Sequence, residues 1–422
     1  IANDYPSIAQ KIEYADPTHE GRTITGLKIS DNVGAEEAEP TILYVSQHHA
    51  REVMTPEVII DFADELTQQY GIDEEVTRWV DENEIYLFPC HNPDGTNYVF
   101  NVNSNWRKNR RDNGDGSFGV DPNRNYPFQW NGCGGSSGTP SSDTYRGPSP
   151  GSEPITQGLM EITEDVRPAI SLTYHTYGEY VLHPFGCDPA LPDDPDRRAH
   201  RDIGSTLAMQ VETDSGTGYY RMGTPPELLY GVDGDSDGWL HGIGGTVAFT
   251  IEMSSGSQGF QPDYDTWRDT TVERNLHGMR YLLRRLADGA VTGQVRDACT
   301  GDPLSAEVGV AEQTFTQGQD PRTSEPETGF FHRILIPGEY TWYGELDGYL
   351  RQDWPIDVDH EPVQRDLWLV PSGSHALEVR DFRVADGDGD ADGQLDPGEQ
   401  AELFVEAIAT GEAVSGVTAT LT

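Results

Sequence analysis

The chain has 422 residues, with 28 Lys plus Arg against 72 Asp plus Glu, which gives a formal net charge of −44. Such acidity disfavours nucleic acid and anionic membranes as partners, and no apolar run of about 18 residues is present to span a membrane. The length predicts two or three domains. The charge suggests a salty or extracellular setting, although a surface that serves solubility alone explains it equally well. We expect a secreted protein that is a monomer. The start at Ile1 predicts that a signal segment or propeptide precedes it and is removed.

The first hundred residues alternate predicted strands and helices. Residues 1–15 resemble the tail of a helix, and residues 23–30, 41–46 and 85–89 are β-prone runs. Residues 55–70 and 74–80 have helical periodicity, with Thr55 as the expected cap, Pro56 in the first turn and Gly71 as the stop. Residues 91–95 are a turn signal. The order of elements predicts an α/β fold with a mixed central sheet flanked by helices.

A long polar stretch, residues 101–149, then interrupts the pattern. A loop of this length in a compact domain is usually functional or disordered, and its arginines and tryptophans favour an ordered functional loop. Predicted helices follow over 152–165, 196–212 and 268–287, and predicted buried strands over 169–174 and 246–251. We expect the first domain to comprise residues 1–289.

The composition changes after residue 289 to β alternation with turns. We expect a small all-β sandwich domain over 290–371, and a partial second β module over 372–422. The four cysteines contain no C-x-x-C pair, which disfavours a cysteine–zinc site, and they allow one or two disulfides whose pairing the sequence does not give.

Three predicted strands end in side chains that can bind a metal or a proton. His49 and Glu52 form a His-x-x-Glu sequence just after strand 41–46, and the other two strands end at His175 and Glu252. A single histidine is usually structural, but carboxyl ends of neighbouring parallel strands are where α/β proteins build sites. Two histidines and one carboxylate with an open position fit a catalytic zinc ion.

Six short motifs occur together in a characteristic order and spacing. They are His49-Ala50-Arg51-Glu52, Asn92-Pro93-Asp94-Gly95, Trp106-Arg107-Lys108-Asn109-Arg110, Asp121-Pro122-Asn123-Arg124-Asn125, Tyr174-His175-Thr176-Tyr177 and Phe249-Thr250-Ile251-Glu252-Met253. As a set they resemble the zinc carboxypeptidases, the funnelin family of pancreatic carboxypeptidases A and B. Residues 131–147 resemble the bacterial carboxypeptidase T branch. The resemblance covers roughly residues 5–288, and from it we expect the first helix of the family fold to be truncated before Ile1.

The resemblance implies a role for each motif residue. His49, Glu52 and His175 correspond to the zinc ligands, Glu252 to the general base, and Arg107 to the group that stabilises the oxyanion. The substrate's terminal carboxylate would be held by Asn123, Arg124 and a mobile Tyr230, and Arg51 and Tyr177 would form outer subsites.

The pocket for the terminal side chain is implied to lie in residues 230–239. Asp235 and Asp237, five and seven residues after Tyr230, correspond to its floor, so we expect a preference for C-terminal Lys or Arg, or dual basic and apolar specificity. A turn-forming or calcium-binding Asp/Gly loop is the alternative interpretation of this stretch.

The downstream segments carry two further resemblances. Residues 293–341 resemble the carboxypeptidase-regulatory, transthyretin-like domain, in which nothing resembles a site. Residues 388–399 fit a twelve-residue calcium loop, against the alternative of an acidic linker. Its predicted ligands, by position in that loop, are Asp388, Asp390, Asp392, Gln394, Asp396 and Glu399.

Together these patterns predict a secreted zinc exopeptidase that removes single residues from the C-termini of peptides or proteins. Two alternatives remain from the sequence. One is a cell-wall peptidase of the same fold that cuts D-glutamyl or diaminopimelate bonds, and the other is a non-catalytic surface-binding protein.

Overall fold

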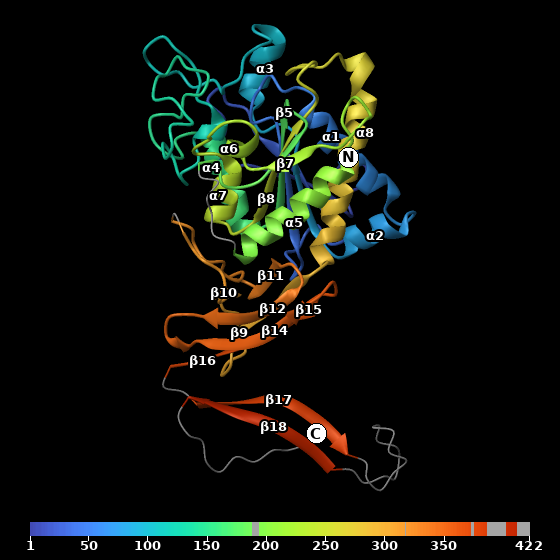
Figure 1. Ribbon diagram of the computed structural model, residues 1–422, viewed down its shortest axis with the longest axis vertical. Coiled ribbons are helices and arrows are strands. Elements are labelled where there is room, and N and C mark those ends of the chain that lie inside the picture. The colour runs from blue at the N-terminus through green and yellow to red at the C-terminus, as the bar shows by residue number, and fades with distance from the viewer. Residues whose placement is uncertain (188–193, 317, 373–374, 386–401, 412–422) are drawn as a thin grey trace.

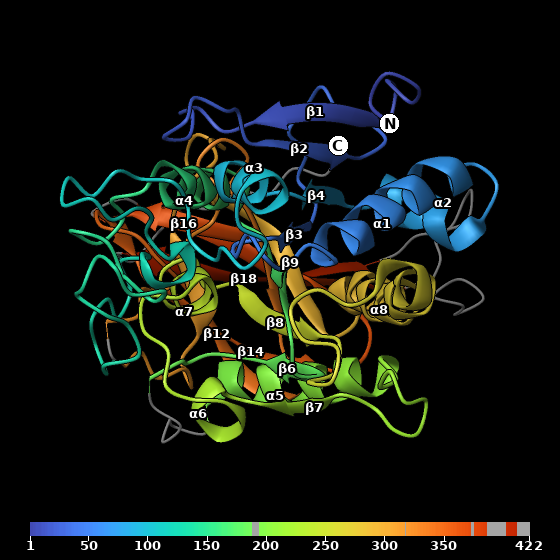
Figure 2. The same cartoon turned by 90° about the horizontal axis from the view of Figure 1, so that it is seen from above.

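The computed structural model describes residues 1–187, 194–316, 318–372, 375–385 and 402–411. Its largest unit is an eight-stranded mixed sheet in the order β1-β2-β4-β3-β5-β8-β6-β7, covered by helices (Figures 1 and 2). The strands are β1 (Ala9–Glu13), β2 (Thr25–Ile29), β3 (Thr41–Ser46), β4 (Glu84–Phe88), β5 (Ile170–Thr176), β6 (Tyr180–Leu182), β7 (Arg221–Gly223) and β8 (Val247–Met253).

Parallel strands form the centre of this sheet. β3 pairs in parallel with β4 and β5, and β5 pairs in parallel with β8. The helices are α1 (Thr55–Gln69), α2 (Glu74–Asp81), α3 (Pro93–Asn101), α4 (Pro154–Val166), α5 (Pro195–Gln210), α6 (Pro225–Leu228), α7 (Ser236–Gly242) and α8 (Tyr264–Ala287). The predicted α/β class with a mixed central sheet is therefore confirmed.

Helices cover both faces of the sheet, and successive side chains of each strand point to opposite faces, so they enter two different cores. On β3, Ile42 and Tyr44 join the core formed with α1, α5 and α8, whereas Leu43 and Val45 join a second core with α4 and α7. This arrangement explains why residues 41–46 form a continuous apolar run. It also leaves the carboxyl ends of β3, β5 and β8 as the edge where polar side chains can gather.

The predicted helical tail at the N-terminus is wrong. Residues 9–13 form β1, which pairs antiparallel with β2 from Ala9 opposite Ile29 to Glu13 opposite Thr25. Pairing with a strand distant in sequence decides this conformation, and local periodicity does not record it.

Two local predictions also need correction at helix starts. The cap residue of α1 is Met54, which makes no side-chain cap, and the Thr55 hydroxyl donates instead to the Glu52 carbonyl. The turn signal at residues 91–95 begins a helix that was not predicted, because the Asn92 side chain accepts from the Gly95 N–H and Pro93 occupies the first turn of α3.

Downstream of α8 the structure is all β. A three-stranded sheet has the order β10-β12-β14, and a second sheet has the order β11-β9-β16-β13, with β15 paired to β9. These strands are β9 (Ala290–Asp297), β10 (Glu307–Val310), β11 (Phe330–Ile334), β12 (Gly338–Glu345), β13 (Tyr349–Leu350), β14 (Gln352–Val358), β15 (Val363–Gln364) and β16 (Leu367–Pro371). They enclose their own core around Trp342. The transthyretin-like resemblance and the domain boundaries stay predictions.

The last described strands, β17 (His375–Ala385) and β18 (Glu402–Gly411), pair antiparallel. The predicted calcium loop, residues 388–399, lies outside the described residues. Across the parts of the chain that the structure does describe, no helix is both long and apolar enough to cross a membrane. Cys133 and Cys187 form a disulfide, whereas Cys90 and Cys299 are free thiols.

Candidate active site

The three predicted metal ligands meet at the carboxyl end of the sheet. His49 and Glu52 lie in the loop between β3 and α1, and His175 lies near the end of β5. His49 Nδ1 lies 2.8 Å from Glu52 Oε1, and His175 Nδ1 lies 3.1 Å from Glu52 Oε2 and 3.0 Å from His49 Nδ1. All three side chains are buried.

The chemistry of this group fits a divalent metal ion. Two imidazole nitrogens and a carboxylate face one point, and their ligand atoms all lie within 4.8 Å of one another. Burial would raise the pKa of Glu52, but His49 and His175 hold it below its usual range, so the carboxylate is ionised. Burial lowers the pKa of His175, which keeps the ring neutral. Zinc binds ionised carboxylates and neutral imidazole rings, so Glu52 and His175 are in the protonation states that it requires.

A fully buried carboxylate, Asp121, connects the metal ligands to the substrate cavity. His49 Nε2 lies 3.2 Å from Asp121 Oδ1. The Arg107 guanidinium donates from Nε to Asp121 Oδ2 at 3.0 Å, and its Nη2 forms an ion pair with the same oxygen at 2.9 Å. Burial opposes ionisation of Asp121, but Arg107 and His49 hold its pKa well below the usual range. Asp121 therefore orients both a candidate metal ligand and the candidate oxyanion group.

Asn123 and Arg124 form the part of the cavity wall next to Asp121. Both belong to a short 3-10 helix, Pro122–Arg124, that begins directly after Asp121. Arg124 donates from Nη1 to the Asn123 carbonyl at 2.6 Å and from Nε to the Gly135 carbonyl at 3.1 Å. Asn123 Oδ1 accepts from the Ser236 N–H at 2.8 Å. These bonds hold the guanidinium at the cavity, where an anionic group of a substrate could be bound in a bidentate way.

Glu252 faces the same cavity from β8. The register places Glu252 opposite His175, which brings the last predicted residue beside the metal ligands. Burial, together with the charge of Glu52, raises the pKa of Glu252 well above its usual value, and Arg107 and Arg124 partly oppose this shift. A carboxyl group with a raised pKa next to two arginines is suited to take up and return a proton.

These side chains surround one cavity of about 360 Å³. All nine predicted catalytic and substrate-binding residues and two of the three predicted ligands line it, while His175 lies behind its wall. The residues that line the cavity are His49, Arg51, Glu52, Arg107, Asn123, Arg124, Asp143, Thr144, Thr176, Tyr177, Leu182, Pro225, Leu229, Tyr230, Val232, Asp235, Asp237, Thr250, Glu252 and Phe260.

Aromatic side chains form the outer rim. Tyr230 follows α6 and is 57% exposed, so its side chain has room to move over the cavity. The Arg51 guanidinium lies 3.9 Å from the ring centroid of Phe260, and the Tyr177 ring lies 4.9 Å from the same ring. Phe260 was not predicted, because nothing in the local sequence around residue 260 marks it.

Two carboxylates lie on the wall formed by the start of α7. Asp235 caps this helix by accepting from the Gly238 N–H. Asp237 accepts from the Thr250 hydroxyl at 2.6 Å and from the Thr173 hydroxyl at 3.4 Å. Burial, and then the neighbouring Asp235, raise the pKa of Asp237 to about 7. Asp237 is thus the carboxylate whose charge changes near neutral pH.

Sequence reasoning missed the role of Asp121, although Asp121 opens one of the quoted motifs. It also missed Asp233, whose Oδ2 accepts from the Cys133 and Gly135 N–H groups and so fixes the disulfide-bonded loop next to Arg124. The position of an Asp directly before Pro-Asn-Arg was the available sequence signal for Asp121. No signal in the sequence connected residue 233 with residues 133–135.

The fold and this site together define the class of protein. It is a metal-dependent hydrolase built on a mixed sheet flanked by helices, with a candidate metal centre of two histidines and one glutamate, a nearby carboxyl base and an arginine-lined cavity. Comparison with known proteins then gives the family. Residues 1–275 match the family model described as zinc carboxypeptidase, so the chain belongs to this family and is a metallocarboxypeptidase. Zinc is accordingly the metal that the family places at a centre of this kind.

Individual relatives are also carboxypeptidases by name. Carboxypeptidase B of Astacus astacus is 33% identical over 268 residues, which cover 62% of this chain and 84% of the relative. Metallocarboxypeptidase A of Trichophyton rubrum is 35% identical over 257 residues, which cover 59% of this chain and 60% of that relative's length.

Solved structures share the fold. Thrombin activatable fibrinolysis inhibitor has a TM-score of 0.60 at 24% identity, covering 67% of this chain and 70% of that chain. Carboxypeptidase A from Helicoverpa armigera has a TM-score of 0.58 at 23% identity, covering 67% and 68%. The resemblance to the zinc carboxypeptidases is therefore confirmed over the N-terminal two thirds of the chain.

Proposed function

We propose that this metallocarboxypeptidase is a secreted, monomeric exopeptidase that removes C-terminal Lys and Arg, with apolar residues as weaker substrates. The observation that carries the specificity is Asp237, a carboxylate inside the same cavity as Arg124. Arg124 suits the α-carboxylate of a substrate, and Asp237 suits a cationic side chain next to it. A single ligand with both groups is a peptide that ends in a basic residue.

The proposed roles of the other residues follow from their positions. Bound zinc supplies a Lewis acid and lowers the pKa of a water molecule. Glu252 accepts the proton of the attacking water and returns it to the leaving amine, which its raised pKa favours. Arg107, held by Asp121, donates to the oxygen on which negative charge develops. Arg124 and Tyr230 hold the terminal carboxylate, and Arg51 and Tyr177 contact residues further upstream.

The test is a panel of blocked dipeptides that differ only in the last residue, assayed with and without a zinc chelator. Asp237→Asn keeps an acceptor oxygen for one of the two threonine hydroxyls but removes the charge. We expect kcat/KM for terminal Arg and Lys to fall by about 30- to 1000-fold, the loss that accompanies breaking a buried charge pair, and kcat/KM for Leu to change by less than about 3-fold. An equal loss for both substrate classes would reject the pocket assignment.

The same panel separates the exopeptidase from the cell-wall peptidase. A peptide whose C-terminus is an amide should lose most of its kcat/KM, because Arg124 then has no carboxylate to bind. Hydrolysis of a D-glutamyl–diaminopimelate substrate in preference to every C-terminal Lys, Arg or Leu peptide would contradict our proposal. The predicted calcium loop, residues 388–399, is proposed as a separate ion site without a catalytic role.

A further inference from the structure

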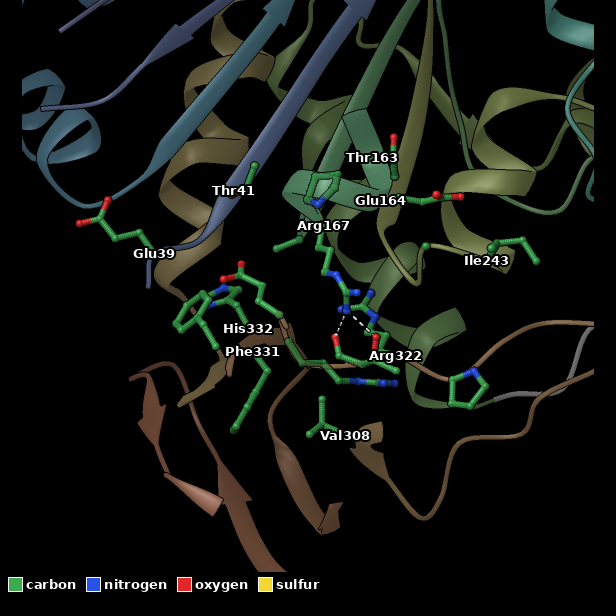
Figure 3. A pocket seen from close by; sticks show the side chains of 18 of the residues that line it. Glu39, Thr41, Thr163, Glu164, Arg167, Ile243, Val308, Arg322, Phe331 and His332 are labelled. Atoms are coloured by element: carbon green, nitrogen blue, oxygen red, sulfur yellow. Dashed lines mark hydrogen bonds between the residues drawn. The ribbon is translucent and has the colours of Figure 1, made fainter. Parts of the chain in front are cut away.

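A second cavity lies between the helical layer and the β-sandwich strands, and it shares no lining residue with the active-site cavity. Its volume is about 160 Å³. One wall consists of the ends of α4 and α7 with Arg167, and the other consists of β11 and residues 321–325 (Figure 3). The cavity is therefore formed by two parts of the chain that are far apart in sequence.

Three arginines line this cavity, and Figure 3 shows Arg167 extending towards the segment that carries Arg322. Arg167 is satisfied, since its Nη1 donates to the Ser324 carbonyl at 2.9 Å and to the carbonyl and hydroxyl of Thr323. The other two arginines, Arg322 and Arg333, are not. Guanidinium nitrogens that lack an acceptor are the feature that makes this cavity unusual.

Arg333, on β11, is only 2% exposed. Its Nη2 donates to Asp196 Oδ1 at 2.8 Å, but its Nε is buried without a hydrogen-bond partner. Arg322 has both Nε and Nη2 buried without a partner, and within the described residues it makes no hydrogen bond or ion pair. A buried guanidinium donor without an acceptor is costly, so these donors call for an acceptor that the chain does not supply.

The local charge balance points the same way. Asp196 is the carboxylate that attracts both Arg322 and Arg333, and it is already bound to Arg333. Burial, and then repulsion from Arg333, lower the pKa of Arg322 to about 10. Three carboxyl groups line the cavity, Glu39, Glu164 and Glu325, and burial raises the pKa of Glu39 and Glu325 to about 7, which weakens these two as counter-charges. The arginines therefore exceed the ionised carboxylates around them.

We propose that this cavity binds a small inorganic oxyanion, phosphate or sulfate, between the guanidinium groups of Arg322 and Arg333. Planar guanidinium groups present paired N–H donors that match the oxygens of such an ion, and its charge supplies the missing counter-charge. The cavity volume accommodates an ion of this size. In so acidic a protein, few other surfaces would attract an anion.

The anion would also strengthen the contact between the two parts of the chain. Arg322 and Arg333 belong to the β-sandwich segment, whereas Asp196 and Gly245, against which the Arg322 side chain lies, belong to the catalytic part. Direct bonds already join them, among them Asp320 N–H to the Gly242 carbonyl at 2.8 Å. A ligand that binds only the assembled cavity stabilises that assembly, by an amount that grows with the logarithm of the free ligand concentration above its Kd.

The experiment is calorimetric titration of the full chain with inorganic phosphate, sulfate and chloride at constant ionic strength. Arg322→Gln removes the unpaired guanidinium without breaking an ion pair. Arg351→Gln is the matched control, since Arg351 is an exposed arginine of the same β-sandwich that pairs with Glu345 and Asp353. The arginines of the active site also attract anions. The anion binding that belongs to this cavity is therefore the part that Arg322→Gln loses and Arg351→Gln keeps.

We expect wild type and Arg351→Gln to bind one phosphate or sulfate ion at this cavity, and Arg322→Gln to bind it with an affinity about 10- to 100-fold lower. Peptide hydrolysis should be unchanged in both variants. We also expect phosphate to raise the unfolding temperature of wild type more than that of Arg322→Gln. Identical phosphate binding in all three proteins would overturn the site. Chloride binding that is as tight as phosphate binding, and equally sensitive to Arg322→Gln, would overturn the oxyanion assignment.

Discussion

Asp121 offers the sharpest test of how the active site is held together, and the perturbation is Asp121→Asn. The substitution keeps the size of a fully buried side chain but removes its charge. Arg107, only 7% exposed, then loses the carboxylate that accepts from its Nε and forms an ion pair with its Nη2. Leaving a buried charge without its partner costs about 3–5 kcal/mol, and we expect the lower half of that range because the amide oxygen still accepts one bond.

The same substitution should weaken zinc binding. His49 Nε2 lies 3.2 Å from Asp121, so the variant loses the negative charge behind a candidate ligand. Loss of such a supporting group typically reduces metal affinity by about 10- to 100-fold. Urea unfolding of the metal-free protein measures the stability change, and competition with a zinc chelator measures the affinity change.

Asp115→Asn is the control, because Asp115 is an exposed carboxylate of the same loop that accepts from Ser117. It should leave both measurements unchanged. If Asp121→Asn matches this control in unfolding free energy and in zinc affinity, then Asp121 does not orient His49 and Arg107, and its role in holding the active site together is refuted.

Three further expectations concern the base, the pH dependence and the disulfide. Glu252→Gln should keep zinc and lower kcat by about 100- to 10,000-fold, measured with metal analysis and steady-state kinetics; substantial residual turnover would remove Glu252 from the chemistry. Since the pKa of Asp237 is about 7, the ratio of kcat/KM for terminal Arg to that for Leu should rise by about 10-fold from pH 6 to pH 8, and a flat ratio would argue against contact with Asp237. Cys133→Ser with Cys187→Ser should lower stability by about 4 kcal/mol in chemical denaturation, from the 54-residue separation. It should also raise KM, because Gly135 accepts from Arg124; an unchanged KM would show that the loop holds Arg124 without the disulfide.

Local patterns predicted most regular elements well, because burial on both sides of a parallel sheet leaves continuous apolar runs and amphipathic helices. They failed at residues 9–13, which take up strand geometry only by pairing with β2. They also failed at Asn92, where a turn signal proved to be a helix cap. In both places the deciding contact was either distant in sequence or specific to one side-chain hydrogen bond.

The sequence by itself determined the chemistry of the candidate centre. His49, Glu52, His175 and Glu252 each follow or end a buried strand, and parallel strands bring their carboxyl ends to one edge, so their meeting was predictable. Only the tertiary structure decided what holds these groups: Asp121 between His49 and Arg107, and the two threonines that bind Asp237. It alone decided the Cys133–Cys187 pairing and the cavity between the helical layer and the β-sandwich, where guanidinium nitrogens of Arg322 and Arg333 lack an acceptor. Strand-end chemistry is encoded locally, whereas counter-charges and interfaces depend on segments that only folding brings together.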